Sequence, residues 1–286
     1  MIDWLMEPFQ HPFNQRAILA ALLIGFTNGY ASAFVVLKKS ALKVGSLSHA
    51  LLPGIAVAIL VAGLHEWSAF LGSLFAALLI GLGSLAVSRG SRLDQDSALA
   101  ILYTAAFSGG IILLRHLKVT QEMEEWLFGN IMGLRDSDLW TNFWISFAAL
   151  GVLTALHRPL LMTLFDAEVA ATLGVPVRAL NYLLLAVLIV VLISSLQAVG
   201  CMLALGLLVT PAATIYLLTD STNALFWGGA LLGGAAATAA VVIGWHLNIE
   251  QGPTIVLVLG AVFLLAFLFG PKYGLLRHAL QQQPPH

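Results

Sequence analysis

The sequence predicts an all-α protein, a polytopic membrane helical bundle with eight or nine transmembrane helices. Of its 286 residues, 59% are apolar and only 9% are charged, and the mean hydropathy is +0.93. A soluble domain of this size needs more charge to cover its surface, so these side chains are expected to face lipid and one another. The second observation is spacing, because charge-free stretches recur at about 20 residues, the length of helix that crosses the roughly 30 Å hydrocarbon layer.

Seven of these stretches have the length of a single span. A further charge-free stretch, Ala179–Thr219, would be about 60 Å long as one helix, twice the membrane thickness. We expect it to turn near Ser194–Gln197 and Gly200, which gives nine spans, or eight if one stretch is re-entrant. The single-span stretches are Ala17–Leu37, Val44–Leu64, Trp67–Ser88, Ser97–Leu114, Leu139–Leu156, Ser221–Trp245 and Gln251–Pro271.

The basic residues predict the orientation. With nine spans, nine lysines and arginines fall on one side and four on the other, and the richer side is expected in the cytoplasm. The chain is then a single transmembrane domain, residues 1–286, in the inner (plasma) membrane. Its N-terminus is outside, its C-terminus is cytoplasmic, and residues 277–286 form a polar tail.

Composition and missing motifs exclude several function classes. The net charge of −1 offers no basic surface for nucleic acid, and the single Cys201 excludes a disulfide framework or a multi-cysteine metal site. The chain contains neither G-x-x-x-x-G-K-[ST] nor H-E-x-x-H. Ser48 adjoins His49, but neighbours on a helix point about 100° apart, so serine chemistry is not favoured. An enzyme is therefore not predicted.

The loop between the fifth and sixth spans carries signals for a short helix. Asp166 stands where an N-cap belongs, and Glu168 adds negative charge to the first turn. Ala167–Leu173 contains helix-forming residues, Gly174 is a natural C′ stop and Pro176 prevents continuation. This helix, about residues 166–174, either lies on the membrane surface or docks a cytoplasmic partner.

His49 is an ionisable residue inside the second predicted span, and such residues are functional candidates because they are costly there. Pro53 follows four positions later and has no N–H, so the carbonyl of His49 loses its helical partner. Ser46, one turn earlier, can lie on the same face. These nitrogen and oxygen donors suit a borderline divalent cation in transit. The alternative is a histidine that hydrogen-bonds a neighbouring helix, with Pro53 only bending the span.

Two further places carry polar or helix-breaking residues. His246, Asn248 and Glu250 cluster in the last outer turn, where they form either a cation site at the outer surface or an ordinary solvated turn. Pro211, in the seventh span, frees the carbonyl of Leu207 in the same way as Pro53 and predicts a kink.

The segment DAEVAATLGVPV resembles the coupling helix of the metal-ion ABC transporter permease family, the membrane subunits of manganese, zinc or iron importers. The family pattern is D-P-E-x-A-x-x-x-G-x-P, and Ala167 replaces its proline. The matching positions here are Asp166, Glu168, Ala170, Gly174 and Pro176. Five other segments resemble the same family in the same order: LMEPFQHPFNQRAI, SLSHALLPGIAVA, DQDSALAILYTAAFSGGIILL, EMEEWLFGNIMGL and QAVGCMLALGLLVTPAATIYLL. The segment WHLNIEQGPTIVL, at the last outer turn, also matches a family segment.

This resemblance implies the metal-importer ABC permease fold and an import function. It implies a second permease copy or paralogue, a cytoplasmic ATP-binding subunit that seats the helix from Asp166 through Leu173, and an extracytoplasmic metal-binding protein. No cofactor is tightly bound; the metal is cargo, and ATP belongs to the partner. The resemblance also implies that His49 and Ser46 line the metal passage.

The chain departs from the family pattern at two places. The signature G-D-A-L-S-H reads V-G-S-L-S-H, so Gly45 stands where an aspartate would lie one turn from His49. In the outer turn, Asn248 takes an aspartate position and Glu250 a proline position. Either a heterodimer partner carries the missing carboxylate or the selectivity differs, so the metal and the dimer type stay open.

Two alternatives remain. A permease for a metal chelate or another small cargo would have more spans and a longer chain. An ion-coupled secondary transporter gives no reason for a cytoplasmic docking helix, and the sequence has no clear internal repeat.

Overall fold

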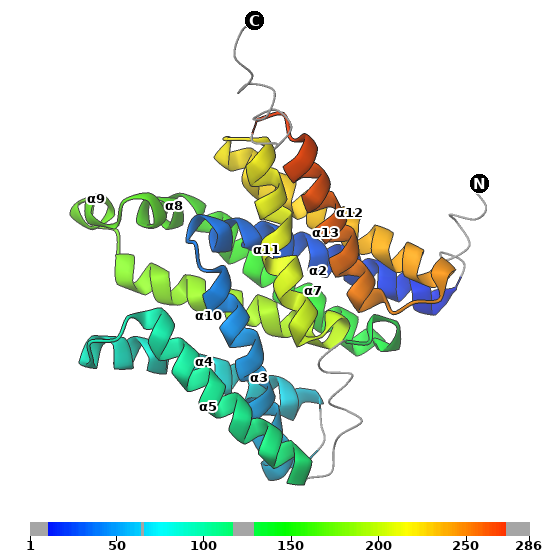
Figure 1. The fold of residues 1–286 in the computed structure, drawn as a ribbon, viewed down its shortest axis with the longest axis horizontal. Helices are drawn as coiled ribbons and strands as arrows, with labels where there is room; N and C mark the ends of the chain where they lie inside the picture. The colour runs from blue at the N-terminus through cyan, green and yellow to red at the C-terminus, as the bar shows by residue number, and fades with distance from the viewer. Residues whose placement is uncertain (1–10, 64–65, 117–128, 273–286) are drawn as a thin grey trace, which may run out of the picture. The chain divides into compact units, whose positions relative to one another are not determined.

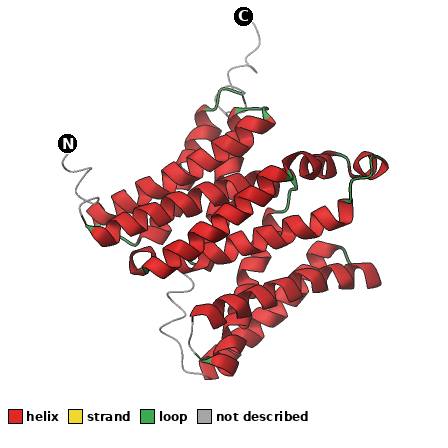
Figure 2. Ribbon diagram, turned by 180° about the vertical axis from the view of Figure 1, so that it is seen from behind, coloured by secondary structure: helices red, strands yellow, loops and turns green. Residues whose placement is uncertain are grey.

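The computed structural model describes residues 11–63, 66–116 and 129–272, and over these residues the ordered elements are all helices (Figures 1 and 2). The all-α prediction is therefore confirmed for the described part. In chain order the helices are α2 (Pro12–Leu37), α3 (Ala41–Ala62), α4 (Glu66–Gly90), α5 (Gln95–His116), the short 3₁₀ helix η2 (Ile131–Gly133), α7 (Asp136–Ala155), α8 (His157–Phe165), α9 (Ala167–Thr172), α10 (Val177–Val199), α11 (Cys201–Leu218), α12 (Thr222–Leu247) and α13 (Gln251–Phe269).

The helices have the length and composition of a multi-pass membrane protein. Among the described residues, six are long and apolar enough to cross a membrane: α2, α4, α5, α10, α12 and α13. A seventh span results if α7 and α8, which meet at 63°, form one bent span. Shorter apolar segments lie within α3 (Leu51–Ala62) and α11 (Ala204–Leu218). The predicted total of eight or nine spans stays a prediction.

The predicted turn inside the long charge-free stretch is confirmed. Helix α10 ends at Val199 and α11 begins at Cys201, with Gly200 between them at a φ of +83°. A residue with a side chain is strained in that left-handed region, so glycine is the residue that lets the chain reverse there.

The chain divides into two compact units. The first unit contains residues 1–39, 130–150 and 206–286; the second contains residues 40–129 and 151–205. They are described separately below, and the single transmembrane domain over residues 1–286 stays a prediction. The predicted polar tail, residues 277–286, lies outside the described residues.

The first unit is built around the packing of α2 against α12. A Cβ added at Gly25 or Gly29 would overlap the carbonyl oxygen of Gly233 or Gly229, respectively, and one added at Gly229 would lie 2.7 Å from the oxygen of Gly29. Only glycine allows two helix backbones to approach this closely.

A hydrogen bond also joins α11 to α2 in this unit. The Ser32 hydroxyl accepts from the Ala212 N–H at 3.1 Å and donates to the Gly29 carbonyl at 2.6 Å. Ala212 directly follows Pro211, which is buried inside α11. Ser32 therefore supplies a buried partner to the backbone at the point where the proline interrupts the helical pattern.

The second unit places α3 between α4 and α5. Gly54 and Gly72 bring the backbones of α3 and α4 together, since a Cβ at Gly72 would lie 2.5 Å from the Gly54 oxygen. Gly110 of α5 lies against α3 at Pro53, where an added Cβ would be 2.7 Å from the proline Cα. Helix α10 packs against α3, α4, α8 and α9. The helix that carries His49 and the short helix α9 therefore share one compact unit and one neighbour, α10.

Candidate functional site

The short helix α9 has the local structure that the sequence predicts. Asp166 is the N-cap, and one of its carboxylate oxygens accepts from the backbone N–H groups of Glu168 at 3.1 Å and Val169 at 2.9 Å. These two donors have no partner within the helix, so the carboxylate stabilises the first turn. Ala167, at the position of the family proline, is the first helical residue and is exposed.

The other end of α9 closes with a Schellman motif. The N–H of Gly174 donates to the Ala171 carbonyl at 3.1 Å, and the N–H of Val175 donates to the Ala170 carbonyl at 3.0 Å. Gly174 has a φ of +79°, the left-handed conformation that the motif requires. Pro176 precedes α10 as its N-cap. The helix is capped at both ends, although it has only six residues.

The side chains around α9 divide sharply by exposure. Ala170 is fully buried, whereas Leu173 and Val169 are 65% and 51% exposed, and Phe165 just before the helix is 68% exposed. Glu168 is also exposed. An exposed set of three large apolar side chains beside an acidic one is a surface feature that a partner could cover.

His49 lies half-buried in α3, beside two aromatic rings from α5. Its ring stacks on Tyr103 with centroids 6.1 Å apart and meets Phe107 edge-on at 5.5 Å. Its Nδ1 atom is buried and forms no hydrogen bond to any residue that the structure describes. The alternative reading, a histidine that hydrogen-bonds a neighbouring helix through this atom, therefore finds no support in the described part of the chain.

Pro53 lies inside α3, four residues after His49. Because proline lacks an N–H, the His49 carbonyl is without its usual helical donor. Ser46 is half-buried one turn before His49 on the same helix. The imidazole and the released carbonyl therefore lie at one level of α3, as predicted from the sequence. Tyr103 and Phe107 were not predicted; their i, i+4 spacing on α5 was the available signal.

Gly45 is not required by backbone packing. A Cβ at this position would meet a methyl group of Leu205 at 3.1 Å, and no backbone atom of another segment is as near. A flexible leucine side chain can shift by a few tenths of an ångström. The missing carboxylate is therefore a difference in chemistry that the fold does not impose.

The turn between α12 and α13 gives Asn248 a structural role. Asn248 has a φ of +52° and ends α12 in the left-handed conformation, with the Ile249 N–H donating to the Gly244 carbonyl at 3.0 Å. Asparagine tolerates this conformation better than most residues with a side chain. Asn248 and Glu250 are exposed and His246 is half-buried. Within the described residues, no three His, Cys, Asp or Glu side chains gather in a metal-binding group.

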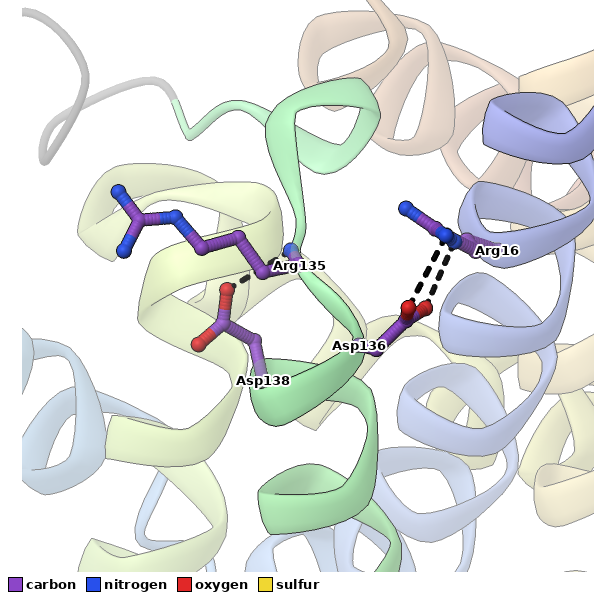
Figure 3. Close-up of polar contacts among 4 residues, drawn as sticks. All are labelled: Arg16, Arg135, Asp136 and Asp138. Atoms are coloured by element: carbon purple, nitrogen blue, oxygen red, sulfur yellow. Dashed lines mark hydrogen bonds and ion pairs between the residues drawn. The ribbon is translucent and has the colours of Figure 1, made fainter.

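An ion pair fixes the start of α2 to the start of α7 in the first unit (Figure 3). Arg16 approaches the Asp136 carboxylate with two nitrogens, at 2.7 and 3.0 Å. Beside it, the backbone N–H of Arg135 donates to Asp138 at 2.9 Å, which caps the helix. Both side chains of the pair are well exposed, so its contribution is at most about 1 kcal/mol.

Comparison with known proteins gives a consistent result over nearly the whole chain. Residues 10–270 match the family described as the ABC 3 transport family. The chain is 36% identical over 268 residues to the manganese transport system membrane protein MntC of Halalkalibacterium halodurans, covering 93% of this chain and 90% of the relative. It is 31% identical to a probable iron transport system membrane protein of Haemophilus influenzae, with 96% of each chain covered.

A solved structure agrees with these sequence matches. The structure of PsaBC from Streptococcus pneumoniae in complex with Fab superposes with a TM-score of 0.87 at 30% identity, and the match covers 98% of this chain and 100% of that one. The helical arrangement within each unit is therefore that of a known permease. From its sequence and its fold together, the chain belongs to the ABC 3 transport family.

Proposed function

We propose that this chain is the membrane-spanning permease subunit of an ATP-binding-cassette importer that moves a divalent transition-metal ion into the cytoplasm. The observation that carries this proposal is the family match over residues 10–270, joined with relatives of nearly equal length that are named as manganese and iron transport proteins. The family is one of transport proteins, so the chain is a transport subunit and ATP hydrolysis belongs to a separate subunit.

The proposed contact with the ATP-binding subunit is α9. Its caps hold six residues rigid, and the exposed Val169, Leu173 and Phe165 offer an apolar surface of the kind that a partner groove covers. Glu168 adds a charge that can fix the orientation of docking. The remaining proposed coupling positions, Asp166, Ala167, Ala170, Gly174 and Pro176, shape and cap this helix rather than present its apolar surface.

The proposed passage for the cation runs beside His49. Its ring nitrogen, the carbonyl released by Pro53 and the Ser46 hydroxyl offer nitrogen and oxygen donors at one level of α3. Weak, incomplete coordination suits a conduit, because the ion must leave as readily as it binds. Pro211, His246 and Glu250 stay candidates for the passage or its entrance, whereas Asn248 is already explained in part by the left-handed cap that ends α12.

The link between α9 and His49 is a short one. Helix α10 packs against both α9 and α3 within the second unit. A displacement of α9 by the ATP-binding subunit would therefore reach the His49 helix through one intervening helix. This supports alternating access, in which closure of two ATP-binding subunits repositions the helices around His49.

The remaining parts of the proposal concern the assembly. The chain is expected to lie in the inner (plasma) membrane with its N-terminus outside and its C-terminus in the cytoplasm. A second copy or a paralogue completes the permease, and an extracytoplasmic metal-binding protein delivers the ion. Manganese and iron are the metals named for the relatives above, and zinc is a third candidate from the resemblance.

The test is total cellular manganese, iron and zinc by elemental mass spectrometry. Cells that lack their own importers would express this chain with an ATP-binding subunit and a metal-binding protein from the same operon. Native, His49→Ala and Glu168→Lys forms would be compared at matched membrane levels. Gly260→Ala is the control, because Gly260 lies on α13 in the first unit and an added Cβ there meets nothing within 4 Å. The proposal predicts that one metal rises with the native and control forms and falls with both variants.

The alternatives make different predictions in the same cells. If no free metal accumulates with an assembled complex but a metal chelate does, the cargo is the chelate. If the metal rises equally without the ATP-binding subunit, the chain is an ion-coupled secondary transporter. Either result would contradict the proposal as stated.

A further inference from the structure

Helix α5 meets α3 at one defined point in the second unit. Gly110 lies against Pro53, and a Cβ at position 110 would lie 2.7 Å from the proline Cα and 2.8 Å from its nitrogen. Backbone contact this close fixes the register of the two helices. Phe107 and Tyr103 lie three and seven residues before Gly110, on the same face of α5. The register therefore places both rings at the level of His49, which lies four residues before Pro53.

The two rings restrict His49 in different ways. The Tyr103 ring lies nearly parallel to the imidazole, at 25° with centroids 6.1 Å apart, whereas the Phe107 ring meets it at 71° with centroids 5.5 Å apart. Two neighbouring rings at these distances limit rotation of the imidazole about its bond to Cβ. Nδ1 of that ring is buried without a hydrogen-bond partner in the described residues. A buried polar atom in this state is costly, so an orientation that keeps it so must be enforced by its surroundings.

We infer that Tyr103 and Phe107 form an aromatic clamp, a pair of positioning residues that hold the His49 imidazole in the orientation in which it meets the cation. This inference rests on the proposed function, because it assumes that His49 meets the cation. The clamp acts through ring contact, and the Tyr103 hydroxyl is not needed for it. It is distinct from the cation ligands, since neither ring supplies one.

The first test is uptake of radioactive manganese(II) by the complete complex in proteoliposomes. Tyr103→Ala and Phe107→Ala should each raise the apparent KM by roughly two- to tenfold, the range expected for losing one ring–ring contact, with Vmax little changed. Tyr103→Phe keeps the ring and should remain near native. Ile101→Ala is the matched control, because Ile101 is on the same helix but 59% exposed.

The second test measures the accessibility of His49 and does not require transport. Diethyl pyrocarbonate modifies accessible imidazole nitrogens, and the modified fraction of His49 can be followed by mass spectrometry on the purified complex. The rate should rise several-fold in Tyr103→Ala and Phe107→Ala and stay near native in Tyr103→Phe and Ile101→Ala. Folding is checked by matched size-exclusion profiles.

The outcomes separate the clamp from the proposed function. Unchanged His49 labelling in both alanine variants, or a Tyr103→Phe variant as impaired as Tyr103→Ala, would overturn the clamp. Faster labelling with no change in KM would also overturn it, because the clamp would then not act on the cation. If the native complex takes up no manganese, iron or zinc, the proposed function fails, while the labelling still decides whether the rings hold His49.

Discussion

The helix pairs α2–α12 and α3–α5 both rely on glycine for backbone contact, but they use it differently. In α2–α12, glycine faces glycine across two helices that contain no proline beyond the first turn of α2. In α3–α5, Gly110 faces Pro53, where α3 lacks a backbone hydrogen bond. The first arrangement closes two intact helices against each other. The second brings a helix against the weak point of its neighbour and places His49 one turn away.

The difference teaches that close packing by small residues does not by itself mark a rigid region. In α2–α12 the rings of Tyr30, Phe34 and Phe226 are fully or almost fully buried, and the buried polar Thr27 and Asn28 donate to carbonyl groups of their own helix. In α3–α5 the same kind of contact borders an unpartnered imidazole nitrogen and a released carbonyl. We therefore expect the first pair to determine stability and the second to determine transport.

The largest expected effect compares the same substitution at two glycines. Gly233→Ala would place a methyl group onto the Gly25 carbonyl and should destabilise the protein by about 1–3 kcal/mol. Gly109→Ala meets nothing within 4 Å and should stabilise α5 by about 0.5–1 kcal/mol. Thermal unfolding in detergent measures both. Equal shifts of the unfolding temperature in the same direction would contradict the expectation that glycine packing between α2 and α12 determines stability.

Pro53→Ala tests the expectation that the α3–α5 pair determines transport. It restores an N–H donor to the His49 carbonyl and removes a helix-breaking residue, for which up to about 3 kcal/mol of helix stability can be recovered. We expect the unfolding temperature to stay level or rise while the Vmax of metal uptake falls. A variant that is both more stable and fully active would show that the proline serves only to bend α3.

A smaller effect is expected at α9. Asp166→Ala removes the acceptor for two N–H groups, which should cost the helix about 0.5–2 kcal/mol. The loss should be local, so hydrogen exchange of residues 167–172 should speed up while the global unfolding temperature changes little. Asp166→Asn is the conservative control, since asparagine also caps helices. Uptake should fall with the alanine variant and recover with asparagine.

The smallest expected effect is a pH dependence at the start of α5. The Asp94 carboxylate accepts from the Ser97 hydroxyl at 2.6 Å and from the N–H groups of Ser97 and Asp96, both at 3.1 Å, which lowers the pKa of Asp94 below its ordinary value of 3.8. Its capping contribution is therefore present above pH 3.8 and is lost as the pH falls through the lowered pKa.

The protection of the first-turn amides of α5 against hydrogen exchange, taken relative to the intrinsic rate at each pH, should fall over that acidic window in the native protein. In Asp94→Asn the same turn should show no such step, because the amide does not titrate. A step of equal size in both proteins would mean that another group controls the end of the helix that carries Tyr103.

Much of the fold follows from local rules that the sequence displays directly. The charge-free stretches correspond to the long helices because only a helix satisfies its own backbone in lipid. The turn at Gly200 and both ends of α9 were predictable because a positive φ and an N-cap each favour few residue types.

The pairing of helices was not predictable in this way. Gly229 and Gly233 indicate that some backbone approaches α12. Their partners, Gly25 and Gly29, lie about 200 residues earlier in the chain, and a small residue does not specify which helix packs against it. Likewise His49 and Pro53 indicated a site, whereas Tyr103 and Phe107 depend on the register of α5 against α3. Asn248 shows the opposite case, in which a candidate metal ligand is also explained by a left-handed cap.

The most direct test of the central claim is ATP-dependent uptake of radioactive manganese(II) by the complete complex in proteoliposomes, native against His49→Ala and Glu168→Lys. The account predicts uptake that requires ATP in the native complex. It predicts strongly reduced uptake with ATPase activity retained in His49→Ala, and loss of both uptake and its coupled ATPase activity in Glu168→Lys. Native-level uptake by His49→Ala would contradict the account, because the cation would then pass without the one ionisable side chain that the second predicted span offers.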